Sequence, residues 1–348
     1  MKNKIKYPNL LLFTKTILKK AGLDKFSINS VATGLCETSL RGVESHGIRL
    51  LPHYVNSALY GRKNPKPKFK FKKKFPSLGV LNADNAFGHA AGYKAIEHCL
   101  KMSKKYGVGV VAVKNSSHPG AMASMAMQAA RKGHIALAFT HADSLVLSHN
   151  GTRPYFGTNP ICVAVPRKNE EPYCLDMATS MISWNKLLIH KNNKIPLKNN
   201  LAADKYGKQT NDANLATSLF GAGNYKGYGL ASFVEILCGI YTGMNFGRKI
   251  PAMYTSSIKK PRKLGQFYLT LRVDGCVSNK MFLSRMFKLS QEIRKEPRKS
   301  KEKVMLPNDV EIKNMKRQKK EGILLSDDIV KKLNELSKTH KVKLNFFK

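Results

Sequence analysis

Residues 110–121 read VVAVKNSSHPGA, and this stretch decides how the surrounding chain is expected to fold. The apolar, β-branched residues of 108–114 predict a strand, and residues 119–132 predict a helix. His118 lies between them, where open α/β sheets bind ligands and where the free N–H groups of a helix attract anions. Histidine suits proton transfer near neutral pH. From position alone, however, an ordinary histidine in a surface loop is the stronger interpretation.

Working outward, the same alternation of strand and helix repeats on both sides. Strands at 78–84 and 134–140 flank the central strand, and a helix at 88–107 precedes it. Strand–helix–strand order predicts parallel pairing through right-handed crossovers. Further strands are expected at 161–166, 173–178 and 265–273, and a buried helix at 226–242. The fold class is therefore α/β.

The chain ends differ from this pattern. Helices are expected at 8–21 and 48–61, with another helix between them that Ser27 or Asn29 can cap. Residues 62–77 are charged and contain prolines, which is typical of a linker or a sheet edge. The tail is basic and closes with a helix that begins at SDD, residues 326–328. We expect two domains: a helical substrate and dimerisation domain from 1–75 plus 285–348, and an α/β cofactor-binding domain from 76–284.

The formal net charge of +39 over 348 residues suggests an anionic partner such as nucleic acid. A compositional explanation competes with this one. Lysine outnumbers arginine, and asparagine and isoleucine are plentiful, as an AT-rich coding sequence would produce. Nucleic-acid readers are expected to use more arginine, which makes bidentate contacts. We therefore do not expect nucleic-acid binding, although it stays open as the alternative from another functional class.

The six cysteines include no CxxC pair and lie mostly in apolar surroundings, which favours reduced thiols in a cytoplasmic protein. The apolar run near the N-terminus is too short for a signal peptide, and no run reaches the roughly 18 apolar residues of a membrane span. Neither the histidines nor the cysteines have the spacing of a metal site, so no metal is expected.

Several short segments contain polar groups that could bind a substrate or a cofactor. In RGVESHGIR, Arg49 could hold a carboxylate bidentately, and Ser45 and His46 add hydroxyl and imidazole groups. Asn159 in FGTNP could bind substrate or a ribose, and Asp176 in LDMATS could bind a ribose hydroxyl. The glycine-rich GAGNYKGYGL resembles a phosphate cradle with Lys226 as its cation. Each motif alone is weak, and no standard dinucleotide fingerprint occurs.

Taken together, the segments resemble the malate/L-lactate dehydrogenase family, which also contains ureidoglycolate and sulfolactate dehydrogenases and a cyclic-imine (piperideine-2-carboxylate) reductase. The resemblance runs from about residue 10 to residue 290 and continues more weakly through GILLSDDIVKKL. The motifs that carry it, in order, are LRGVESHGIRLLPHY, DNAFGHAAG, NSSHPGA, GTNPICVAVP, LDMATS, NYKGYGL and LGQFYL.

The resemblance implies an NAD- or NADP-dependent oxidoreductase whose nicotinamide-binding sheet is unlike a Rossmann domain. It also implies a homodimer with a shared active site. The family's proton acceptor falls on His118, and its Ser-His-Gly motif falls on Ser45, His46 and Gly47. The cofactor-contacting residues that the resemblance implies are Asp176, Met177, Ala178 and Lys226.

Three departures from the family pattern bear on specificity. The family often has arginine where this chain has Leu50, which weakens the case for Arg49 as the carboxylate clamp. Ala142 replaces a small polar cofactor contact of some relatives, and Trp184 with Asn185 fills a variable loop.

The expected reaction is hydride transfer between nicotinamide and a small, malate- or lactate-like 2-hydroxy or 2-keto acid. His118 accepts the hydroxyl proton, and His46, Arg49 and Asn159 orient the substrate. Ureidoglycolate or a cyclic imine acid is the alternative substrate, and a catalytically inactive relative is a further possibility.

Overall fold

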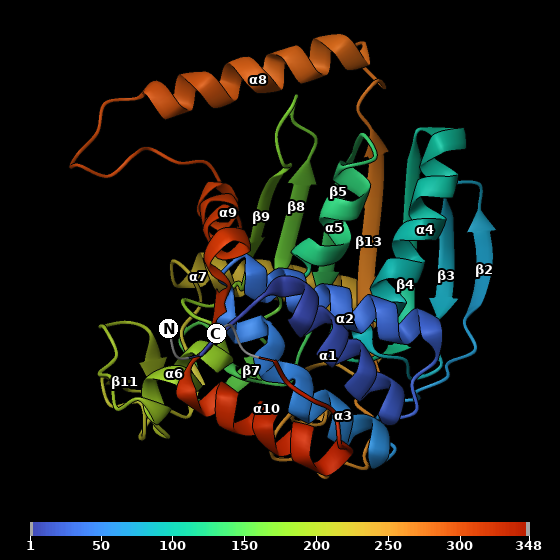
Figure 1. The fold of residues 1–348 in the computed structure, drawn as a ribbon. Coiled ribbons are helices and arrows are strands. Elements are labelled where there is room, and N and C mark those ends of the chain that lie inside the picture. Colours follow the sequence, from blue (N-terminus) through green and yellow to red (C-terminus); the bar gives the residue numbers. More distant parts are fainter. Residues whose placement is uncertain (1–2, 346–348) are drawn as a thin grey trace.

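The computed structural model describes residues 3–345 and is built around one seven-stranded mixed sheet in the order β2-β3-β4-β13-β5-β8-β9 (Figure 1). The strands of this sheet are β2 (Lys70–Phe75), β3 (Leu78–Asn82), β4 (Val108–Ser116), β5 (His134–Thr140), β8 (Ile161–Val165), β9 (Tyr173–Met177) and β13 (Leu264–Arg272). The predicted α/β class is confirmed, with every strand expected from the sequence present.

Strand pairing departs from expectation at the centre of this sheet. β3 and β4 pair in parallel, as predicted. β4 and β5 do not pair, because β13 lies between them and is antiparallel to both. The alternation of strand and helix therefore predicted correctly that β4 and β5 run in the same direction. It did not predict that β13 lies between them. Residues 70–75 of the expected linker or edge form β2, an edge strand that pairs only with β3.

Successive side chains of a strand point to opposite faces of a sheet. Here apolar side chains occur on both faces, and helices cover both of them. Ala136 and Ala138 of β5 pack with Tyr268 under α4 and α5, whereas Phe139 packs with Val234 under α7 on the other face. Figure 1 shows α4 and α5 lying along the strands. The bounds of these helices are α4 (Gly88–Tyr106), α5 (Ala123–Ala130) and α7 (Tyr225–Glu235), which continues as the π-helix η3 (Ile236–Ile240).

A separate helical core brings the two ends of the chain together. It contains apolar side chains of the first three helices and of the last helix, among them Leu10, Leu35, Tyr54, Ile329 and Leu333. Figure 1 shows the last helix beside α3. The elements are β1 (Lys4–Ile5), α1 (Tyr7–Lys20), α2 (Lys25–Leu40), the 3-10 turns η1 (Glu44–His46) and η2 (Ile48–Leu50), α3 (Leu51–Leu59), β14 (Ile323–Leu324) and α10 (Asp327–His340).

Capping of α2 differs from the prediction. Asp24, not Ser27 or Asn29, precedes the helix, and its carboxylate accepts a hydrogen bond from the Ser27 N–H at 2.7 Å. Ser27 and Asn29 lie inside the helix, as its third and fifth residues. Asp24, Ser27 and Asn29 are all residue types that cap helices, and the helix begins directly after the first of them.

The rest of the chain forms a small lobe, a projecting arm and a helix, α9, that packs against α2. The lobe contains a five-stranded sheet, and the arm contains α8, of which only Ser290 is buried (Figure 1). These elements are β6 (Val146–Leu147), β7 (Pro154–Phe156), α6 (Trp184–Asn192), β10 (Ala202–Ala203), β11 (Gln209–Thr210), β12 (Ser218–Leu219), η4 (Gly247–Lys249), α8 (Asn279–Lys295) and α9 (Asp309–Glu321).

All six cysteines are free thiols, as predicted, and only Cys276 is exposed. Within residues 3–345, no helix is long and apolar enough to cross a membrane. Over the same range, no cluster of three or more His, Cys, Asp or Glu side chains could hold a metal ion.

Candidate active site

A pocket of about 350 Å³ opens at one edge of the large sheet, where it faces the helical core. β4, β5 and β9 run in the same direction because each is separated from the next by one antiparallel strand. Their carboxyl ends therefore meet at this edge. His118 follows β4, His141 follows β5, and Asp176 and Met177 end β9. This convergence is the usual position of a ligand site in open α/β sheets.

The loop that carries His118 is fixed by a buried amide. The side-chain nitrogen of Gln266 donates hydrogen bonds to the Ser116 hydroxyl at 2.9 Å and to the Ser117 carbonyl at 3.1 Å. Gly120 has φ +69°, and a Cβ there would lie 2.6 Å from the His89 ring. This position therefore needs glycine for both its conformation and its space. The sequence NSSHPGA accordingly gives one well-defined turn.

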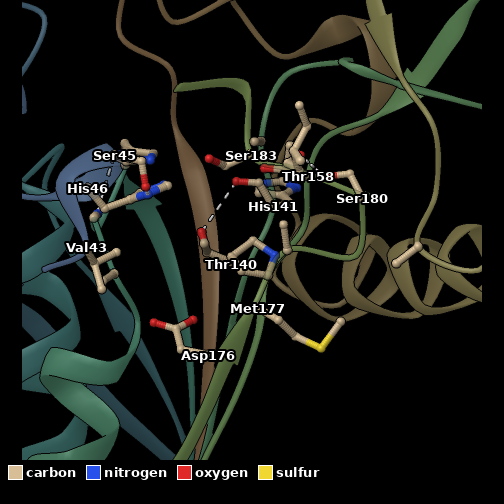
Figure 2. A pocket seen from close by; sticks show the side chains of 18 of the residues that line it. Val43, Ser45, His46, Thr140, His141, Thr158, Asp176, Met177, Ser180 and Ser183 are labelled. Carbon is tan, nitrogen blue, oxygen red and sulfur yellow. Dashed lines mark hydrogen bonds between the residues drawn. The ribbon is translucent and has the colours of Figure 1, made fainter. Parts of the chain in front are cut away.

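His46 and Ser45 reach the same pocket from the helical core, through the short turn η1. The rings of His46 and His118 stack with centroids 5.7 Å apart. The Ser45 hydroxyl lies 2.8 Å from Nδ1 of His46. Figure 2 shows Ser45 and His46 across the pocket from Thr140 and His141. The structure thus brings together two histidines that are 72 residues apart in the sequence.

Both stacked histidines favour their neutral forms. Burial lowers the pKa of His46 to about 4. Burial, with further repulsion from His46 and from the cations Arg262 and Lys63, holds the pKa of His118 well below its usual range. At neutral pH each imidazole therefore has one unprotonated nitrogen, which is the state that a proton acceptor requires.

Asp176 joins the pocket to the start of α5. Its carboxylate accepts a hydrogen bond from the Ala123 N–H at 2.8 Å, at the positive end of that helix. Burial outweighs this contact and raises the pKa of Asp176 to about 6. The carboxylate is therefore ionised at neutral pH but carries a desolvation cost. Met177 and Ala178 follow it on the pocket wall.

Asp176→Asn is expected to stabilise the fold at alkaline pH. Because the pKa is raised in the folded state, the folded chain binds a proton more tightly than the unfolded chain, so stability falls as pH rises from about 4 through 6. Asparagine avoids that loss, and its side-chain oxygen can still accept from Ala123. We expect a gain of about 1–2 kcal/mol in the free energy of unfolding. The side chain is partly exposed, so solvent screens its charge and limits the gain.

Urea unfolding of Asp176→Asn and of the unsubstituted protein at about pH 8 and about pH 4 would measure this effect. The gain should be present at the higher pH and absent at the lower one. An equal difference in free energy of unfolding at both values would show that the buried charge is not its source.

A second cavity of about 310 Å³ adjoins the first and shares Val43, Ala121 and Asp176 with it. Apolar side chains such as Met127 and Leu306 line it, together with the carboxylates of Glu37 and Glu311. The two cavities meet at these shared residues, beside Asp176 and the start of α5, and together they are called the cofactor cleft below. The hydroxyl, imidazole and carboxylate groups among its lining residues could hold a two-part ligand such as a dinucleotide.

Three residues that the sequence singled out do not line the pocket. Arg49 makes ion pairs with Glu44 at 2.6 Å and Asp328 at 2.7 Å, so both ends of its guanidinium are occupied. Asn159 is fully buried, where its side-chain oxygen accepts from the Ala142 N–H at 3.1 Å and its amide nitrogen donates to Glu235 at 2.8 Å. Lys226 has an exposed side chain on the first turn of α7.

The sequence reasoning missed several polar residues of the pocket wall, namely His141, Thr140, Ser180 and Ser183, whereas Thr158 belongs to the FGTNP segment that it did single out. His141 is the most informative of these. It follows the strand 134–140 in the same way that His118 follows 108–114, so the shared direction of the two strands was a signal for it. Nε2 of His141 accepts from the Gly265 N–H at 2.9 Å, which fixes its ring against β13.

The chain is similar to known proteins along most of its length. The family described as malate/L-lactate dehydrogenase matches residues 5–334. Ureidoglycolate dehydrogenase (NAD(+)) of Escherichia coli K12 is 32% identical over 276 residues, which cover 79% of each chain. Malate dehydrogenase of Pyrococcus abyssi is 32% identical over 295 residues, with 82% of this chain and 80% of the relative covered.

Solved structures show the same fold. Malate dehydrogenase from Entamoeba histolytica superimposes with a TM-score of 0.93 at 25% identity, covering 99% of this chain and 100% of that one. Sulfolactate dehydrogenase from Methanocaldococcus jannaschii gives a TM-score of 0.89 at 28% identity, with 98% of each chain covered.

Proposed function

Because this chain belongs to the malate/L-lactate dehydrogenase family and is an oxidoreductase acting on CH–OH groups, we propose that it oxidises a small 2-hydroxy acid with a nicotinamide cofactor. The observation that carries the proposal is the stacked pair His46 and His118 in a pocket at the carboxyl ends of β4, β5 and β9. The reverse reaction reduces the corresponding 2-keto acid.

His118 acts as the proton acceptor in this proposal. As the alcohol is oxidised, its hydroxyl proton moves to the unprotonated nitrogen of the His118 imidazole, and in reduction the same nitrogen returns it. The bound nicotinamide supplies the hydride acceptor. A positioned base contributes a rate factor of about 10²–10⁴.

Neutral donors hold the substrate carboxylate in this proposal. No lysine or arginine lines the part of the pocket that the structure describes. The Ser45 hydroxyl and the His46 imidazole face the space beside His118 and can donate to the carboxylate or to the carbonyl that forms. Arg49 and Asn159 do not contact the substrate in this proposal. Arg49 is ion-paired with Asp328, and Asn159 fixes the backbone of the pocket residue Ala142.

We propose that the cofactor occupies the cofactor cleft along Asp176, Met177 and Ala178. Glu37 and Glu311 line its second half, and a carboxylate there accepts a ribose hydroxyl but repels a ribose phosphate. Among the described residues that line that cavity the single arginine is Arg41, and it is paired with Glu171 at 2.6 Å. We therefore infer NAD in preference to NADP. Lys226 remains a proposed contact for a cofactor phosphate, because it lies in the first turn of α7, four residues after Ala222 of the pocket wall.

An activity screen tests this proposal. Malate, lactate, sulfolactate and ureidoglycolate would be offered with NAD and with NADP, and 2-keto acids and a cyclic imine acid with the reduced cofactors. Nicotinamide absorbance reports turnover. We expect at least one 2-hydroxy or 2-keto acid to be turned over, faster with NAD than with NADP. Turnover of only ureidoglycolate or only an imine would select the alternative substrate, and no turnover with any of them would reject the proposal.

The proposed assembly is a homodimer. α8 projects from the body, with Met281, Phe287 and Leu289 exposed by 52%, 45% and 46%, which is a poor arrangement for an isolated chain (Figure 1). Light scattering should give twice the chain mass of 38.9 kDa. A mass that stays at one chain at micromolar concentration would contradict the dimer.

A further inference from the structure

Tyr54 of α3 makes two contacts with His118 through one hydroxyl group. Its oxygen lies 2.9 Å from Nδ1 of the His118 ring and 3.0 Å from the His118 backbone carbonyl. The carbonyl can only accept a hydrogen bond, and within residues 3–345 no other group donates to it. The tyrosine hydroxyl therefore donates its hydrogen bond to the carbonyl. Its oxygen is then left to accept a hydrogen bond from the Nδ1–H group of His118.

Packing holds the tyrosine ring, and with it the hydroxyl oxygen, beside His118. Tyr54 is fully buried, and its ring packs edge-on against Phe87 and His89, each with centroids 5.8 Å away. The ammonium nitrogen of Lys63 lies 3.5 Å from the ring centre. Burial raises the pKa of Tyr54 well above its usual range, so the hydroxyl keeps its proton at any working pH.

A competing group sits on the other side of Nδ1. The backbone N–H of Gly120 lies 3.3 Å from that nitrogen and can only donate to it. This contact would require Nδ1 to be unprotonated, which would place the ring proton on Nε2. Tyr54 and Gly120 thus demand opposite tautomers of the same neutral ring, and the Tyr54 contact is the shorter by 0.4 Å.

We propose that Tyr54 is a positioning residue that holds neutral His118 in the tautomer with its proton on Nδ1. Nε2, on the opposite side of the ring, is then the unprotonated nitrogen. This inference rests on the proposed role of His118 as proton acceptor, because only the Nε2 lone pair is left to take the substrate proton. Removing the Tyr54 hydroxyl leaves Nδ1 facing the Gly120 N–H alone, so the ring proton moves to Nε2 and the base is lost.

Nitrogen NMR of histidine-labelled protein tests the tautomer without any substrate. The His118 signals are assigned by their absence from His118→Asn. In the unsubstituted protein at pH 7.5, Nε2 of His118 should have the shift of an unprotonated nitrogen and Nδ1 that of a protonated one. The two shifts should exchange in Tyr54→Phe. A proton on Nε2 in the unsubstituted protein overturns the inference, even if Tyr54→Phe does not fold.

Kinetics provide the second measurement. Tyr54→Phe should lower kcat/KM for hydroxy acid oxidation about 10- to 100-fold, the usual effect of losing a group that orients a functional histidine. Ser57→Ala is the matched control, because it removes another fully buried hydroxyl from α3, bonded only to the His53 carbonyl. Ser57→Ala should keep both the tautomer and the activity. Unchanged kcat/KM in folded Tyr54→Phe would also overturn the inference.

The two proposals fail in different ways. If the chain turns over none of the screened substrates but His118 has its proton on Nδ1, the proposed function fails and the role of Tyr54 in setting the tautomer stands. If turnover is found and the proton is on Nε2, the function stands and the role of Tyr54 fails.

Discussion

Replacing His118 with asparagine is expected to lower kcat for hydroxy acid oxidation by about 10²–10⁴-fold. Asparagine keeps a polar side chain of similar size in the loop but cannot take a proton from the substrate at neutral pH. The loop itself should persist, because Gln266 and Gly120 fix its backbone independently of the imidazole. Binding of the nicotinamide cofactor, measured by fluorescence of the reduced form, should change little.

The pH dependence of the unsubstituted protein follows from the same group. The pKa of His118 lies below its usual range, so the ring is already neutral at pH 7 and kcat/KM for oxidation should be level above that pH. It should fall only as pH drops through the depressed pKa and the ring gains its second proton. The His118→Asn variant should lose this acid limb.

His134→Asn is the matched control for this substitution. His134 begins β5 at the edge of the sheet opposite to the pocket, and its ring lies 3.0 Å from the Lys132 carbonyl. Its loss should leave kcat unchanged. If His118→Asn retained more than a tenth of the normal kcat with intact cofactor binding, His118 would not be the proton acceptor.

Local patterns in the sequence predicted most elements of the fold but not their neighbours. The strand at 108–114 and the helix at 88–107 depend on residue type and on side chains close in sequence, and both are present. The position of β13 between β4 and β5 depends on residues more than 120 positions apart. No local periodicity encodes such a pairing, because β13 fits equally well beside any apolar strand of matching length.

The candidate site was predictable in part for the same reason. Loops that follow parallel-running strands converge, so His118 and Asp176 could be anticipated at one edge of the sheet. Arg49 could not be placed in this way, because its partner Asp328 is 279 residues away and is brought near only by packing of α10 on the helical core. The contact of Tyr54 with His118 likewise depends on how α3 docks against the sheet domain.

Replacing Arg262 with methionine is expected to destabilise the fold by about 3–5 kcal/mol, because it leaves a buried carboxylate without its cation. Arg262 is 2% exposed and pairs with Asp143, which is 8% exposed. Its Nε also donates to the Pro251 carbonyl at 2.8 Å. In the variant, the Met253 N–H at 3.2 Å is the remaining hydrogen-bond donor to Asp143 that the structure shows. Urea unfolding gives the change in free energy of unfolding.

A double variant separates the loss of the pair from the cost of the unpaired charge. Asp143→Leu combined with Arg262→Met removes both charges, and we expect it to recover a large part of the lost stability, since the damage of the single change is an unpaired buried carboxylate. Arg272→Met is the surface control: its pair with Asp274 has side chains exposed by 42% and 36%, so solvent screens the two charges and the substitution should change stability much less than Arg262→Met. If Arg262→Met cost no more than this control, the loss of the cation from the buried Asp143 carboxylate would not destabilise the fold as predicted. A double variant as unstable as the single one would show instead that the lost bond to Pro251, and not the unpaired charge, dominates.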